Sequence, residues 1–129
     1  MKPLKKNIHI VVECTDTGYS AYTTDLPVFT TGKDVRELYQ HVLEALNLYY
    51  YDKGFVVTER NLKLQLDLQQ FFQYYRVLNA SFLAHRIGMS PSLLSQYVRG
   101  LKKPSARQTR RILEGIQRIG KELADLQFI

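Results

Sequence analysis

The sequence predicts an α+β protein, in which a small N-terminal sheet of three to four strands with one helix is followed by an all-α helix-turn-helix domain. Short β-branched and aromatic segments, separated by turn residues, fill the first half of the 129 residues. Apolar residues at helical spacing fill the second half. The change of pattern places the domain boundary between residues 1–66 and residues 67–129.

The first half begins with a predicted β-hairpin. Residues 8–14 (IHIVVEC) and 19–24 (YSAYTT) have strand-like composition, and the TDTG between them is a tight-turn sequence. Pro27 breaks the run because it donates no ladder hydrogen bond, and VFTT then supplies a third short strand. We expect a helix from about Asp34 to the YYYDKGF segment. The strict alternation of LKLQLDL (residues 62–68) predicts a fourth strand.

The second half is predicted to be helical. Residues 69–78 (QQFFQYYRVL) carry aromatic side chains at helical spacing, a pattern more typical of a core than of base stacking. Asn79 is expected to begin a helix that Gly88 ends, and a second short helix follows Ser90. Ser105 is expected to begin a long final helix, to about residue 126. Its apolar face consists of Ile112, Ile116, Ile119, Leu123 and Leu126.

The charge of the chain is distributed unevenly. Residues 1–59 contain six Lys/Arg and eight Asp/Glu, a balance of −2, whereas residues 60–129 contain twelve and four, a balance of +8. A basic half of this kind indicates a polyanionic partner, most simply nucleic acid. The alternative is a basic surface that is only solvated.

The segment SPSLLSQYVRGLKKPS (residues 90–105) carries two stripes at helical spacing. Leu94, Tyr97 and Val98 form the apolar stripe, which is expected to anchor the helix to its domain. The polar stripe suits a DNA major groove, where Gln pairs with adenine and Arg with guanine. Candidate base-proximal residues are Ser90, Pro91, Ser92, Ser95, Gln96 and Arg99. Candidate phosphate contacts are Lys102, Lys103 and Arg107, with Arg110 and Arg111 as an extension. A polar solvent-facing surface is the alternative.

The segment FLAHRIGMSPSLLSQYVRGLKKPS resembles the helix-turn-helix of phage-repressor-like (Xre/Cro) regulators. The residues that match are Leu83, Ala84, Gly88, Met89, Ser95, Gly100, Lys102, Lys103, Pro104 and Ser105. Two positions depart from the pattern. Val98 stands where many members carry a glutamate, and Ser92 lies near the position of a base-reading glutamine. The resemblance therefore implies DNA binding without implying which bases are read.

The segment GYSAYTTDLPVFTTGKDVRELYQHVLEALNLY is similar to the HicB antitoxin domain. The match is carried by Asp25, Leu26, Pro27, Gly32, Asp34 and Glu37, while Val28 replaces a common glycine. The resemblance implies a partial ribonuclease-H-like fold without its catalytic residues. It also implies two partners, a small mRNA-cleaving ribonuclease toxin (HicA) and the operator DNA of the operon, which is bound by a homodimer or higher homo-oligomer.

The sequence offers few candidates for catalysis. His9, His41 and His85 are scattered, and Cys14 lies in an apolar alternating segment typical of a buried, inert thiol. Asp16 and Asp25 sit in turn signals, where Asp caps its own backbone, although acids on such a sheet, including Glu13, could bind Mg²⁺. We therefore expect no enzymatic activity, no metal and no cofactor.

The expected function is that of a HicAB-type antitoxin that neutralises its toxin and represses its own operon. The alternatives are a stand-alone Xre-family regulator, whose first half serves dimerisation or effector binding, and an interaction protein with a degenerate helix-turn-helix. Pairing is expected through the final helix or the sheet edge. No run of about 18 apolar residues is present, so the chain is expected to be intact, cytoplasmic and free of membrane contacts.

Overall fold

The computed structural model describes residues 1–128 and divides the chain into two compact units. The first unit is Met1–Tyr74, and the second begins at Tyr75. Strands lie in the first unit and helices dominate the second, which confirms the α+β class expected from the sequence. Each unit is described by itself below.

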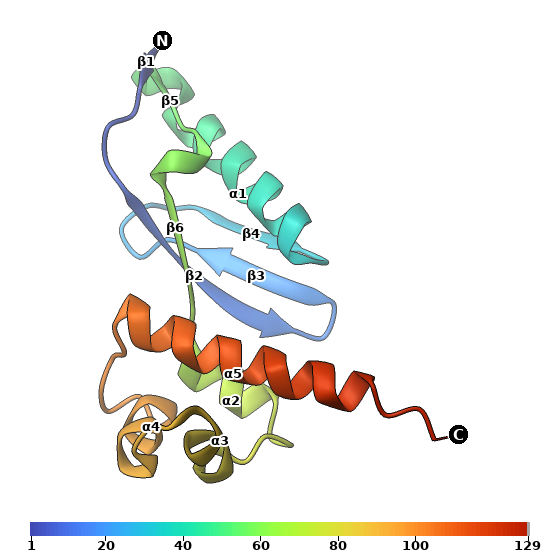
Figure 1. Ribbon diagram of the computed structural model, residues 1–129. Helices are drawn as coiled ribbons and strands as arrows, with labels where there is room; N and C mark the ends of the chain where they lie inside the picture. The colour runs from blue at the N-terminus through green and yellow to red at the C-terminus, as the bar shows by residue number, and fades with distance from the viewer. Residues whose placement is uncertain (129) are drawn as a thin grey trace. The chain divides into compact units, whose positions relative to one another are not determined.

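The first unit is built on a four-stranded sheet in the order β4-β3-β2-β6 (Figure 1). The predicted hairpin is confirmed, because β2 (Ile8–Thr15) pairs antiparallel with β3 (Gly18–Tyr22). The third strand, β4 (Phe29–Gly32), pairs antiparallel with β3. The fourth, β6 (Leu62–Leu66), returns beside β2 and runs parallel to it.

The long helix α1 (Val35–Tyr50) packs against β3 and β4 and closes the core of this unit. Alternate residues of β2 point into that core because side chains of a strand alternate between its two faces. The helix contributes residues at a spacing of four, the period that gives a helix one apolar face. The buried cluster is Ile8, Ile10, Val12, Ala21, Leu38, Val42, Leu46, Tyr50, Val57 and Leu62.

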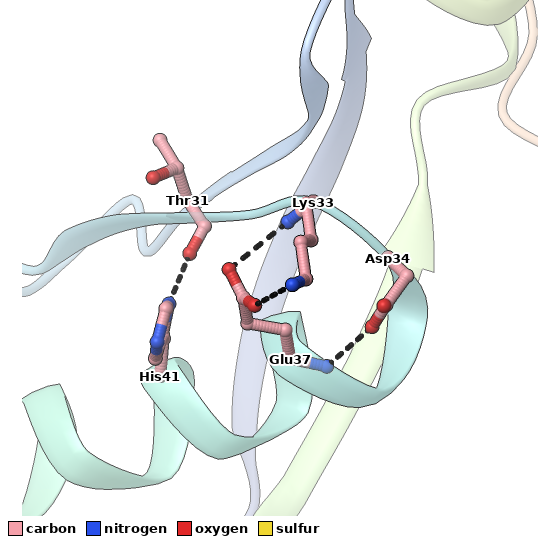
Figure 2. Close-up of polar contacts among 5 residues, drawn as sticks. All are labelled: Thr31, Lys33, Asp34, Glu37 and His41. Carbon is pink, nitrogen blue, oxygen red and sulfur yellow. Dashed lines mark hydrogen bonds and ion pairs between the residues drawn. The ribbon is translucent and has the colours of Figure 1, made fainter.

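A set of polar contacts joins β4 to the start of α1 (Figure 2). The Asp34 carboxylate accepts the backbone N–H of Glu37 at 2.8 Å, which caps the helix, as its sequence position predicted. Glu37 in turn accepts the backbone N–H of Lys33 and pairs with the Lys33 ammonium group at 3.7 Å. One helical turn later, His41 Nδ1 lies 2.6 Å from the carbonyl oxygen of Thr31. Because a carbonyl only accepts, the Nδ1 atom is the donor.

A short parallel pair of strands was not predicted. β1 (Lys2–Pro3) pairs with β5 (Phe55–Val56), which follows a 3-10 turn at Tyr51–Lys53. A second 3-10 turn, Glu59–Asn61, leads into β6. Both strands are too short to show an alternating pattern, so the sequence carries no signal for them.

The domain boundary expected after residue 66 is wrong, because the next helix belongs to the first unit. α2 (Leu68–Tyr74) packs against β2. The side-chain amide of Gln70 accepts the backbone N–H of Cys14 at 2.8 Å and donates to the Cys14 carbonyl at 2.9 Å. It thus acts as a strand partner for β2 beyond the end of β6. The boundary therefore falls after Tyr74.

The helix α2 is also shorter than the sequence pattern suggested. Its Phe71 and Phe72 rings are buried and pack edge to face at 5.3 Å, which confirms the core role expected for the aromatic residues of this helix. Tyr75 and Leu78 lie beyond its end, in a turn in which the N–H of Leu78 donates to the Tyr75 carbonyl. The extended backbone of Asn79 then starts a new helix.

The second unit consists of α3 (Ala80–Ile87), α4 (Pro91–Val98) and α5 (Ala106–Ala124) (Figure 1). α3 packs against both of the other helices. All three helices start and end where the capping residues predicted, within one or two positions. The buried apolar residues of this unit are Leu83, Ala84, Met89, Leu94, Tyr97 and Ile112.

α5 approaches α3 closely at Gly115. A Cβ atom at this position would overlap the Cγ2 atom of Ile87 and come within 3.7 Å of a methyl group of Leu83. Gly120 lies further along the same helix, and a Cβ atom there would meet nothing within 4 Å. The two glycines therefore differ in packing although they share one helix.

We predict opposite effects of the same substitution at these two glycines. Gly115→Ala should lower the free energy of unfolding of the second unit by about 1–2 kcal/mol, because overpacking outweighs the better helix propensity of Ala. Gly120→Ala should raise it by up to about 1 kcal/mol, since only the propensity changes. Hydrogen exchange of the amides of α3 and α5 in the full chain measures both. Stabilisation by both substitutions would contradict the close approach.

Candidate nucleic-acid interface

α3 and α4 form a helix-turn-helix whose turn is fixed by backbone hydrogen bonds. Gly88 ends α3 in the left-handed conformation (φ 68°), which favours glycine at this position. The N–H of Met89 donates to the Ala84 carbonyl at 2.9 Å, and the Met89 side chain is buried. Ser90 then accepts the N–H of Leu93 and caps α4, with Pro91 at its first turn.

The apolar stripe of α4 holds this helix to the unit. Leu94 is fully buried, Tyr97 is 6% exposed, and Val98 is half-buried. These are the three residues that the sequence assigned to anchoring. Their burial fixes the rotation of α4 about its axis, and hence which residues point away from the core.

The residues predicted to be base-proximal occupy the other side of α4 to different degrees. Ser90, Pro91, Ser92 and Arg99 are exposed, whereas Ser95 and Gln96 are half-buried. The exposed side chains at the helix start are short, so they leave room for a base edge to approach the helix. Among the six, Ser90 also caps the helix, so its hydroxyl oxygen is already an acceptor for Leu93.

The backbone of Gln96 organises the basic loop that follows α4. Its carbonyl accepts the N–H of Leu101 at 2.9 Å and that of Lys102 at 3.3 Å. Gly100 closes the same turn with a φ of 74°. The loop is thus an ordered continuation of the helix, and it presents Lys102 and Lys103 to solvent.

Positive charge is concentrated where this loop meets α5. Six Lys/Arg and no acidic residue lie between positions 99 and 111. Lys102, Lys103 and Arg107 are exposed, and none of them pairs with a carboxylate among residues 1–128. A shallow hollow of about 480 Å³ lies at the start of α5, lined by Ser105, Arg107, Gln108 and Arg111. The free N–H groups and positive dipole end of a helix suit an anionic group there.

Arg111 has a structural contact that the sequence did not suggest. Its guanidinium donates to the carbonyl oxygens of Ile87 and Gly88, both at 2.8 Å. These are carbonyls at the end of α3, which have no partner within the helix. Arg111 therefore joins α5 to the turn of the helix-turn-helix. The contact spans more than twenty positions, so no local pattern reveals it.

Several ionisable residues of the first unit have structural roles. Asp16 accepts the hydroxyl of Tyr74 at 3.0 Å, and His41 binds Thr31 (Figure 2). Burial raises the pKa of the Cys14 thiol, so it stays protonated near neutral pH and is a poor nucleophile. No group of three or more His, Cys, Asp or Glu side chains among residues 1–128 is arranged to hold a metal ion.

Comparison with family models, curated proteins and solved structures found no match to this chain. None of the helices in the described part of the chain is both long and apolar enough to cross a membrane.

We predict that Arg111→Met destabilises the second unit, because the two carbonyls at the end of α3 lose their charged donor. The contact is solvent-exposed, so the expected decrease is about 1 kcal/mol in the free energy of unfolding. Arg110→Met is the matched control, since no side-chain bond joins that neighbouring residue to the turn. Hydrogen exchange in α3 and α4 distinguishes the two variants. Equal protection in both would show that the Arg111 contact contributes nothing.

Proposed function

We propose that this protein is a HicB-like antitoxin that neutralises a small mRNA-cleaving ribonuclease and represses its own operon by binding operator DNA. The DNA-binding part is carried by one observation. The exposed face of α4, with short side chains at its start, adjoins a run of six cations that no acidic residue interrupts. A face for base edges beside a face for phosphates is what a recognition helix needs.

In the proposed complex, α4 enters the major groove and its N-terminal half meets the base edges. Gln96 supplies an amide, which suits adenine, and Ser92 and Ser95 supply hydroxyls that bind either a base or a phosphate. Arg99 lies at the end of α4 and suits guanine or a neighbouring phosphate. One such helix reads only a few base pairs, so the proposed complex contains two copies on two half-sites.

Lys102, Lys103 and Arg107 hold the DNA backbone in this proposal. They carry no base information, but they fix the register of α4 in the groove. The hollow at the start of α5 adds backbone N–H groups to the guanidinium groups that line it. Neutralising several phosphates would make the affinity strongly dependent on salt.

The antitoxin part rests on the resemblance of the first unit to HicB domains. The strand-strand-strand-helix-strand order of β2, β3, β4, α1 and β6 agrees with it. The Asp25-Leu26-Pro27 segment forms a closed loop, in which the Thr23 hydroxyl donates to the Leu26 carbonyl at 2.8 Å. We assign no catalytic residue, metal or cofactor to this unit, and we place the protein in the cytoplasm with its toxin and DNA.

A stand-alone Xre-type regulator is the second candidate function. The same exposed face of α4 supports it, because DNA binding needs no toxin. The first unit would then serve dimerisation or effector binding. A short neighbouring gene that encodes a small basic protein with a glycine-rich histidine segment distinguishes the antitoxin from this alternative.

We predict that base and phosphate contacts give different signatures in binding to DNA from the region upstream of the gene. The double variant Ser92→Ala and Gln96→Ala should discriminate less well against random DNA, by about 1–3 kcal/mol for each good base interaction that it no longer makes. Lys102→Ala and Lys103→Ala should weaken binding to all sequences and reduce the salt slope by roughly one unit per phosphate contact. Gel shifts at several salt concentrations measure both.

Two results would contradict this interface. Unchanged specificity in the Ser92 and Gln96 variant would exclude α4 as the reading helix. An unchanged salt slope would remove the two lysines from the phosphate contacts.

We also predict that the full chain rescues growth when it is co-expressed with the neighbouring short gene. That gene alone should arrest growth, and the wild-type chain should restore it. The Ser92 and Gln96 variant should rescue equally well, because toxin binding is assigned to the first unit. Absence of arrest, or arrest that the full chain leaves unrelieved, argues against the antitoxin and for the stand-alone regulator.

A further inference from the structure

One end of the second unit exposes large apolar side chains. We call Val77, Phe82, Leu123, Leu126 and Phe128 the apolar end. Their exposed fractions are 89%, 70%, 60%, 60% and 91% in that order. Isolated exposed hydrophobic residues are ordinary, but several of them around one groove mark an interaction surface.

A groove joins three members of the apolar end. Val77, Phe82 and Leu123 border a groove of about 530 Å³, and Leu83 and Ile119 also line it. Its residues come from the segment before α3, from α3 itself and from the last third of α5. A groove of this size accommodates one or two large side chains. Leu126 and Phe128 follow α5 and remain exposed beyond it.

The charge of this region differs from that of the DNA-binding region. Residues 112–128 contain two Lys/Arg and three Asp/Glu, a balance of −1, whereas residues 99–111 carry six cations and no acid. Arg86, which lines the groove, is paired with Glu122. A nearly neutral, apolar surface does not attract nucleic acid, and it offers little electrostatic attraction to a strongly basic protein.

We propose that the apolar end is the surface through which two copies of this chain pair. Exposed side chains of this size together offer about 500–600 Å² of apolar surface per copy. Pairing the same patch on two copies would bury about 1,000–1,200 Å², the area that a specific interface needs. A neutral patch with both a groove and protruding side chains is self-complementary, as a two-fold interface requires.

This pairing surface rests on the proposed function in one respect, because a DNA-reading helix of this kind works in pairs. It lies on the end of α5 opposite to the cations at its start, so pairing leaves Lys102, Lys103 and Arg107 free to bind DNA. Two copies joined in this way would present two α4 helices that are related by a two-fold axis.

The test is the oligomeric state of the full chain without DNA, measured by analytical ultracentrifugation over a range of concentrations. The wild-type chain should dimerise, and Phe82→Glu and Leu123→Glu should each raise the dimer dissociation constant by about tenfold or more. Phe128→Glu should act in the same direction. This residue follows the last helix, so its replacement leaves the fold intact. Leu48→Glu is the matched control, since Leu48 is 80% exposed but lies in the first unit.

A monomeric wild-type chain would overturn the proposal, and so would a dimer that Leu48→Glu dissociates while the three other variants leave it intact. A monomeric chain in which the three variants abolish growth rescue would assign the apolar end to the toxin and overturn the second copy as its occupant. Because the measurement uses no DNA, loss of the dimer and failure of operator binding are separate results.

Discussion

The close approach of α5 to α3 is the constraint on which the second unit depends. With no Cβ atom at Gly115, Ile87 packs directly against the backbone of α5. This contact brings Arg111, one turn earlier, within hydrogen-bond distance of the carbonyls at the end of α3. The turn that follows α3 sets the direction of α4, so the position of the proposed reading helix depends on a packing contact outside that helix.

The first unit depends on side-chain amides in a comparable way. Asn47 binds both the N–H and the carbonyl of Val57, and Gln70 does the same for Cys14. The buried Asn61 amide donates to the carbonyls of Leu4 and Lys6. Each amide replaces a strand partner where the sheet ends, because a backbone group without a partner destabilises a buried segment. These contacts keep short strands in place that have little surface of their own to bury.

The parts of the fold that local patterns determine could be predicted, and the tertiary contacts could not. The hairpin, α1 and the helix-turn-helix follow from alternation, helical spacing and caps such as Asp34 and Asn79. Gln70 and Arg111 resemble ordinary surface residues in sequence, since their partners lie far away along the chain. The domain boundary failed for the same reason. For α4, the anchoring residues were predicted correctly because burial follows helical spacing, whereas contacts with DNA stay a prediction.

The apolar stripe of α5 shows why spacing alone does not assign a role to each residue. The stripe repeats evenly along the helix, yet Ile112 is fully buried, Ile116 and Ile119 are half-buried, and Leu123 is 60% exposed. The helix extends beyond the surface that α3 offers, so the same pattern serves the core at one point and faces solvent further on. A 19-residue helix is longer than two eight-residue helices need for their packing. Its excess length, apolar where it is uncovered and basic at its opposite end, is consistent with two partners of different chemistry.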